Sequence, residues 1–66
     1  MGASILRLPQ VILLTGLSRS AIYDMIAKGD FPKQLKLTSR SSGWVEAEVQ
    51  SWINGRIADR DAEVAA

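Results

Sequence analysis

The sequence predicts a mainly α-helical domain with a small β-hairpin, that is, a winged helix-turn-helix of three helices plus a wing. Two observations predict this fold class. Two short amphipathic segments lie about three residues apart across a glycine, which is the local signature of a helix-turn-helix. A hairpin pattern then follows at residues 34–45. The 66 residues suffice for one small domain, expected at residues 1–60, with residues 61–66 as a frayed C-terminal tail.

The first helix is predicted to begin at Leu8. Pro9 suits its first turn, where the missing N–H loses no hydrogen bond. Leu8, Val11 and Ile12 recur at the spacing of one buried helical stripe. Gly16 supplies the backbone freedom of a tight helix exit, so we expect this helix to end there after about two turns.

The second helix is predicted to begin after Ser18, whose hydroxyl can accept a hydrogen bond from an N–H of the following turn. A second buried stripe follows at helical spacing and consists of Ile22, Met25 and Ile26. Gly29 is expected to end this helix in a left-handed conformation. The two helices and their short turn form the predicted helix-turn-helix.

Residues 34–45 are predicted to form the β-hairpin. Leu35 and Leu37 alternate with polar residues, which is typical of a strand with one solvent-exposed face. The turn-rich segment 39–43 places Arg40 near the tip. Trp44 begins the returning strand, and we expect its large ring to hold the hairpin against a helix in the core.

A third helix is predicted from about Glu46, with acidic residues in its first turn. Its apolar residues Val49, Trp52, Ile53 and Ile57 fall on one face, which we expect to be buried. Trp52 is therefore predicted to join the core. Beyond this stretch the apolar stripe fades.

The composition excludes several kinds of chemistry. Cysteine and histidine are absent, so we expect no thiol nucleophile, imidazole base or ordinary zinc site. Glu46 and Glu48 point to different helix faces and form no working carboxylate pair. The sequence therefore predicts a non-enzymatic protein without cofactor or metal. Its longest apolar run has four residues against the ~20 of a membrane span, and no signal-peptide pattern is visible, so we expect a cytoplasmic protein.

The charge is distributed unevenly along the chain. Residues 1–44 carry six basic and two acidic residues, whereas residues 45–66 carry two basic and five acidic residues. A polyanion is therefore attracted to the first part of the chain and repelled by the last part. Three cations, Lys33, Lys36 and Arg40, accompany the predicted hairpin, and such clusters bind a phosphate backbone.

A family resemblance rests on one long run and on four residues that follow it. These are Gly16-Leu-Ser-Arg-Ser-Ala-Ile-Tyr-Asp-Met-Ile-Ala-Lys-Gly-Asp-Phe-Pro-Lys33, then Gly43-Trp44, Val49 and Trp52. On these residues the chain resembles the AlpA family of small phage-related regulators, and similar chains include excisionases with a winged, MerR-like helix-turn-helix. The resemblance implies a recognition helix at residues 18–28 in the DNA major groove and a hairpin whose cations approach the backbone. Asp24 departs from the family pattern, which often has a basic or polar residue there.

Eight residues are predicted to contact DNA. Arg19 is the best candidate for a base contact, because its planar fork can bond guanine O6 and N7 together. Ser18 combines capping with a phosphate contact, and Tyr23 either packs on the edge of the domain or contacts DNA. The full set is Ser18, Arg19, Ser20, Tyr23, Lys28, Lys33, Lys36 and Arg40.

The sequence thus predicts a sequence-specific double-stranded DNA-binding protein. The resemblance implies either a transcriptional regulator or an excisionase, a DNA recombination directionality factor, of a prophage or integrative element. A single module buries only ~600–1,000 Å² on DNA, so we expect further copies on adjacent sites, with an integrase or other recombinase, or RNA polymerase, as a protein partner. The alternatives are a protein-interaction module on the same scaffold that does not bind DNA and a dimeric toxin–antitoxin component.

Overall fold

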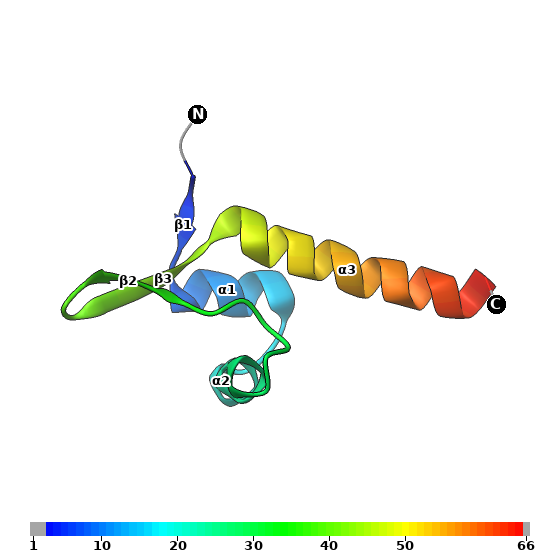
Figure 1. Ribbon diagram of the computed structural model, residues 1–66, viewed down its shortest axis with the longest axis horizontal. Helices are drawn as coiled ribbons and strands as arrows, with labels where there is room; N and C mark the ends of the chain where they lie inside the picture. Colours follow the sequence, from blue (N-terminus) through cyan, green and yellow to red (C-terminus); the bar gives the residue numbers. More distant parts are fainter. Residues whose placement is uncertain (1–2, 66) are drawn as a thin grey trace.

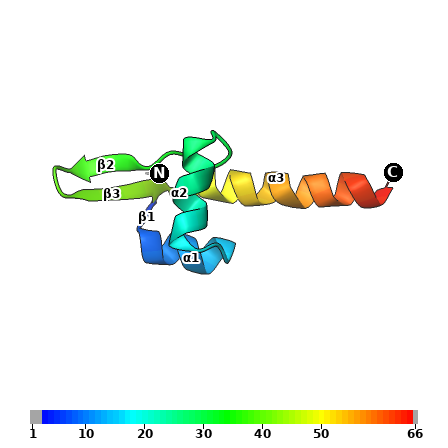
Figure 2. The same cartoon turned by 90° about the horizontal axis from the view of Figure 1, so that it is seen from below.

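The computed structural model describes residues 3–65 as helices and an antiparallel three-stranded sheet (Figure 1). It confirms the predicted mainly α-helical class with a hairpin wing. The elements are β1 (Ile5–Leu6), α1 (Leu8–Thr15), α2 (Arg19–Ala27), β2 (Leu35–Thr38), β3 (Ser41–Val45) and α3 (Glu46–Ala65). The hairpin of β2 and β3 projects on one side and the outer part of α3 on the opposite side, with α1 and α2 between them (Figure 2).

The corner between α1 and α2 depends on Gly16, whose φ of 73° lies in the left-handed region. The hydroxyl of Thr15 donates a hydrogen bond to the carbonyl of Val11 (2.7 Å) and accepts one from the N–H of Leu17 (3.2 Å). Gly29 has a φ of 78° just beyond α2. Both predicted glycine exits are therefore confirmed, and each satisfies the carbonyl groups at a helix end.

The sheet contains one strand, β1, that was not expected from the sequence. β1 pairs with β3, with Ile5 opposite Val45 and Leu6 opposite Trp44, so the strand order is β1-β3-β2. Two residues are too few to display an alternating pattern, and only the pairing with β3 defines this strand. The pairing ties the chain just before α1 to the base of the hairpin.

Gly43 lies where β1 and β2 flank β3. A Cβ atom at this position would lie 2.5 Å from Cγ2 of Ile5, 2.9 Å from the carbonyl oxygen of Leu6 and 3.3 Å from Cδ1 of Leu37. The two distances to carbon atoms are shorter than a favourable carbon–carbon contact of about 3.5–4.0 Å, and the distance to the carbonyl oxygen is also too short for a Cβ atom. The close approach of the strands therefore requires glycine here for reasons of space.

The core lies between the inner face of the sheet and the helices. Among the described residues, the buried side chains are Leu6, Val11, Ile22, Phe31, Trp44 and Val49. Trp44 is only 1% exposed, which confirms its predicted place in the core. Trp52 is half-buried and packs against the edge of this cluster, so its predicted burial is only partial.

Two predicted faces are not buried. Ile57 is 43% exposed because it borders an open hollow between α3 and the end of α1. Leu35 and Leu37 are 38% and 39% exposed because the hairpin projects beyond the helices. The third helix was predicted to bury its apolar face as far as Ile57, and the hairpin was predicted to expose only one face. Both predictions are wrong.

Two tryptophan side chains hold the loop that joins α2 to β2. The indole N–H of Trp44 donates to the carbonyl of Pro32 (3.0 Å), and that of Trp52 donates to the carbonyl of Asp30 (2.6 Å). Between these two bonds, Phe31 meets the ring of Trp52 edge-on, with centroids 4.9 Å apart. The loop is thus fixed on both sides by an apolar ring with a polar edge.

α3 is longer than its apolar stripe. It continues without a break to Ala65, so the expected domain boundary at residue 60 falls inside the helix. The side chains of residues 54–63 are exposed. Fraying at residues 61–66 concerns motion and stays a prediction, and residue 66 lies outside the described residues.

We predict that Gly43→Ala lowers the free energy of unfolding by about 1–3 kcal/mol, because the added methyl group overpacks the junction of β1 and β3. Gly55→Ala is the matched control. Nothing lies within 4 Å of a Cβ at Gly55, which is inside α3, so this change should raise stability by about 0.5–1 kcal/mol. Urea denaturation measures both, and equal effects would contradict the close packing at Gly43.

Candidate nucleic-acid interface

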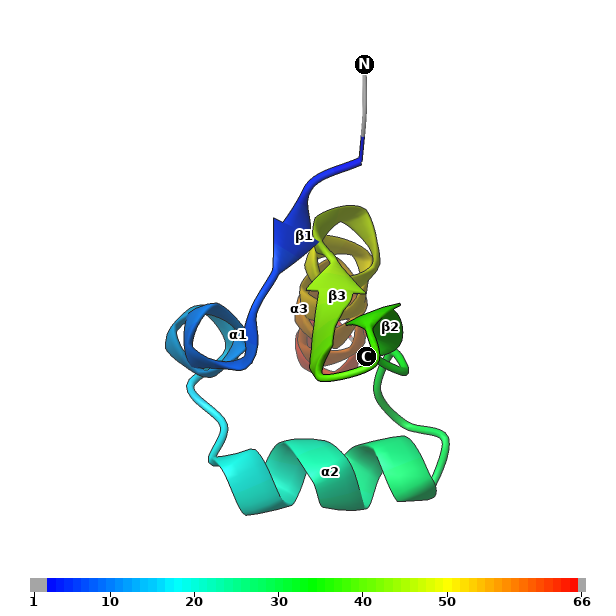
Figure 3. The ribbon, with the colours of Figure 1, turned by 90° about the vertical axis from the view of Figure 1, so that its left-hand side faces the viewer.

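One face of α2 is free to meet a ligand. Ile22 is fully buried beneath the helix, whereas Arg19, Ser20, Asp24 and Lys28 on its other faces are exposed. Viewed from the hairpin side, α2 lies at one edge of the molecule, with α1, the sheet and α3 all on its other side (Figure 3). A ligand can therefore approach α2 without displacing another element.

A hollow of about 540 Å³ opens beside the N-terminal end of this helix. Three arginines line it from three different parts of the chain: Arg7 from the link between β1 and α1, Arg19 from the first turn of α2, and Arg40 from the tip of the hairpin. The other lining residues are Leu8, Pro9, Tyr23, Ser41, Ser42 and Trp44. Because no acidic residue lines the hollow, its walls attract anions.

Arg19 is held over an aromatic ring. Its guanidinium carbon lies 5.8 Å from the ring centroid of Tyr23, within the range of a cation–π contact. Tyr23 in turn packs against Trp44, with ring centroids 6.3 Å apart and an angle of 58° between the planes. The ring of Tyr23 therefore packs on the edge of the domain, which is the first of the two roles predicted for it. The second, contact with DNA, stays a prediction.

The other end of α2 is electrically neutral. The ammonium group of Lys28 forms an ion pair with Asp24 one turn earlier, at 3.0 Å, and both side chains are largely exposed. Such exposed pairs are worth only a few tenths of a kcal/mol. Asp24 is therefore paired with Lys28 at the end of the same helix, although it lies on the exposed face of α2.

Ser18 caps α2, as predicted. Its hydroxyl oxygen accepts a hydrogen bond from the N–H of Ala21 at 3.1 Å, and its backbone is extended, as an N-cap requires. Ser20 is exposed in the first turn. The two serines therefore stand at the same helix end, close to Arg19.

The two lysines near the hairpin lie in different surroundings. Lys36 is opposite Ser42 in the β2–β3 pair, and residues opposite each other share one face of a sheet. Ser42 lines the arginine hollow, and Lys36 opposite it is exposed but does not itself line the hollow. Lys33 instead borders a separate hollow, where it lies near Glu48 of α3.

Arg7 was missing from the predicted set. Nothing in its local sequence distinguishes it from any exposed arginine. It lines the hollow because β1 pairs with β3 and α1 begins directly afterwards. Since β1 was not predicted, the position of Arg7 could not be predicted either.

Within the described residues, no group of three or more acidic side chains is arranged to hold a metal ion. No helix in the described part is long and apolar enough to cross a membrane.

Comparisons with known proteins identify related sequences. The model of the family described as Prophage CP4-57 regulatory protein (AlpA) matches residues 4–57. The uncharacterized protein ORF88 of enterobacteria phage P4 is 51% identical over 55 residues, which are 83% of this chain and 62% of that protein. The DNA-binding transcriptional activator AlpA of Escherichia coli (strain K12) is 43% identical over 58 residues, 79% of this chain and 83% of that protein. The chain thus spans less than two thirds of the phage P4 protein.

Loss of the α2 cap should be measurable. We predict that Ser18→Ala lowers the free energy of unfolding by about 1 kcal/mol, because one N–H at the helix start loses its acceptor. Ser20→Ala, two residues later and exposed, should change stability by less than about 0.5 kcal/mol. Thermal and urea unfolding of both variants compare the two effects, and equal losses would contradict the capping role.

Proposed function

The chain belongs to the AlpA family, and on this premise we propose that it binds double-stranded DNA with sequence preference as a regulator of a prophage or integrative element. The family description and the DNA-binding activity named for the Escherichia coli relative support this proposal. The structural observation that carries it is the acid-free hollow on which Arg7, Arg19 and Arg40 converge.

In the proposed complex, α2 enters the major groove. An α-helix with its side chains is about 10–12 Å across and the major groove is about 12 Å wide, so this nine-residue helix can lie inside the groove. Arg19 in the first turn reads a base edge, for which a guanine offers two acceptors to the guanidinium fork. Tyr23 limits the conformations of this arginine from below, so less side-chain entropy is lost on contact.

The hairpin and the start of α1 contact the phosphate backbone in this proposal. Arg40 and Lys36 extend from the wing toward one strand, and Arg7 supplies a further cation from the chain just before α1. Ser18 and Ser20 offer hydroxyl groups at the positive end of the α2 dipole. Lys28 and Lys33 contribute at the margins, since one is paired with an acid and the other lies apart from the hollow.

We further propose that the protein acts without catalysis, by placing itself on DNA as a transcriptional regulator or an excisionase. One such module covers too little DNA for strong discrimination, which favours further copies on adjacent sites. A recombinase or RNA polymerase would then be recruited by the assembly. A protein-interaction module on the same scaffold is the competing function, and absence of any duplex binding at about 50 mM salt would favour it.

The first test concerns Arg19. Duplexes selected from a randomised pool by the wild-type protein are titrated in fluorescence anisotropy beside scrambled duplexes. Arg19→Ala should reduce the preference for the selected sequence by about 5- to 150-fold, corresponding to the 1–3 kcal/mol of a bidentate base contact. Arg19→Lys keeps the charge but not the fork, so it should lose preference while retaining the salt dependence. Unchanged preference in both variants would mean that α2 does not read the bases.

The second test concerns the wing. Replacing both Lys36 and Arg40 by Ala should weaken binding to selected and scrambled duplexes alike. The slope of log K against log salt should become shallower by about 2, because two phosphate contacts are lost. Ser39→Ala, in the same turn, is the uncharged control and should leave the slope unchanged. A slope that does not respond to the double substitution would remove the hairpin from the DNA.

A further inference from the structure

We infer that the outer half of α3, together with a hollow beside α1, is a docking surface for a second copy of this chain, with the two α3 helices antiparallel. This inference goes beyond the proposed function and does not depend on it. It rests on three features: an unsupported length of helix, an apolar hollow at its base, and a pattern of charges that complements itself.

The first feature is the length of α3 that extends past the other elements and is exposed. The helix has 20 residues, and its outer half extends past the rest of the molecule (Figure 1, Figure 2). Its residues 54–63 are all exposed. Helices shorter than about 12–15 residues are marginal in water without tertiary packing. A partner that covers this segment would therefore stabilise it.

The second feature is an open hollow where the outer half of α3 begins. Its volume is about 450 Å³, and its apolar lining includes Leu14, Leu17, Ile53 and Ile57. Leu14 is 48% and Ile57 43% exposed, so much of this surface is removed from water only by a partner. The charged residues of the lining are Arg56 and Arg60, and no acid lies among them. The hollow therefore suits an apolar segment that carries negative charge.

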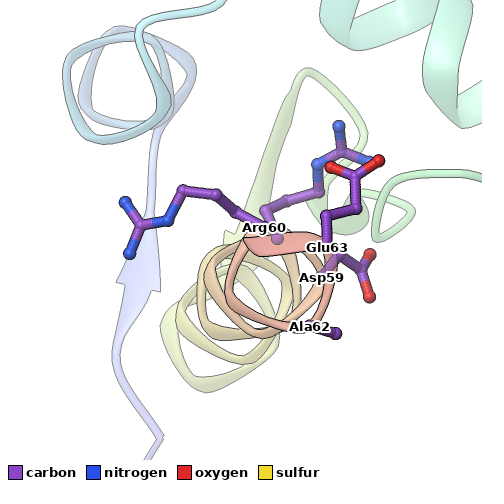
Figure 4. A pocket seen from close by; sticks show the side chains of 5 residues that line it. Asp59, Arg60, Ala62 and Glu63 are labelled. Carbon is purple, nitrogen blue, oxygen red and sulfur yellow. The ribbon is translucent and has the colours of Figure 1, made fainter. Parts of the chain in front are cut away.

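The chain itself provides such a segment at the end of α3. Asp59 and Glu63 project from the same side of the helix one turn apart, and Ala62 beside them is small enough to allow close approach (Figure 4). Arg56 and Arg60 line this same surface. One side of α3 thus presents two basic and two acidic residues in the order basic, acidic, basic, acidic. Arg60 also forms an exposed ion pair with its neighbour Asp61 at 2.8 Å, which the contact with a second copy would replace or share.

Antiparallel pairing brings these charges into complementary register. When Arg56 faces Glu63 of the second copy, Arg60 faces Asp59, and two-fold symmetry repeats both pairs. A parallel pairing in register would instead place each charge opposite its like. Because exposed ion pairs contribute little energy, the apolar contacts of Ile57 and Leu14 supply most of the attraction, and the charges select the direction.

A charge-swap experiment tests this pairing without DNA. Sedimentation equilibrium of the wild-type protein should show concentration-dependent dimerisation. Arg56→Glu should weaken dimerisation by about tenfold, because two attractive pairs become repulsive. The double variant Arg56→Glu with Glu63→Arg should restore it. Positions 56 and 63 are two turns apart within one helix, so restoration requires contact between copies.

Lys33→Glu is the control, since it changes the charge equally at a site away from the outer half of α3. It should leave dimerisation unchanged. Ile57→Ser should weaken it without unfolding the protein, because this side chain lies outside the core, and far-UV circular dichroism checks the fold. A wild-type protein that stays monomeric at about 1 mM, or a double variant that remains as weak as Arg56→Glu, would overturn the inference. Either result would leave DNA binding by the monomer unaffected.

Discussion

The relative position of α2 and the hairpin depends on two hydrogen bonds from indole N–H groups to the loop between them. Trp44 and Trp52 each donate to a carbonyl of residues 30–32, and the ring of Phe31 fills the space between. Loss of either donor leaves a carbonyl group without this hydrogen bond. Where the carbonyl is buried, this lowers the free energy of unfolding by about 1–3 kcal/mol. Such a loss would also free the loop, so the two cationic elements would no longer present one continuous surface.

Most of the fold could be predicted from local sequence, because its elements are marked by residues with strong conformational preferences. Gly16, Ser18 and Gly29 define the ends of α1 and α2 through backbone geometry that is independent of the rest of the chain. β1 could not be predicted, since two residues form a strand only when a partner is present. Burial at Ile57 was predicted wrongly because helical periodicity shows which residues share a face but not how far a neighbour extends.

The candidate interface could be predicted in part, because some of its residues lie at element boundaries that are marked in the local sequence. Arg19 and Arg40 stand at element boundaries that the sequence defines, and the structure brings them to one hollow. Arg7 reaches that hollow only through the pairing of β1, and Lys33 is kept from it by the path of the loop after Pro32. The ion pair between Asp24 and Lys28 follows from helical spacing and could have been found from the sequence.

β2 forms one edge of the sheet, because within the described residues it pairs only with β3. A free strand edge offers N–H and C=O groups to other chains, and the exposed Leu35 and Leu37 favour stacking of such strands. Lys36 lies between these two leucines, and a lysine on a short edge strand opposes pairing between molecules. The same positive charge that is proposed to meet a phosphate therefore also opposes edge-to-edge pairing of β2 between molecules.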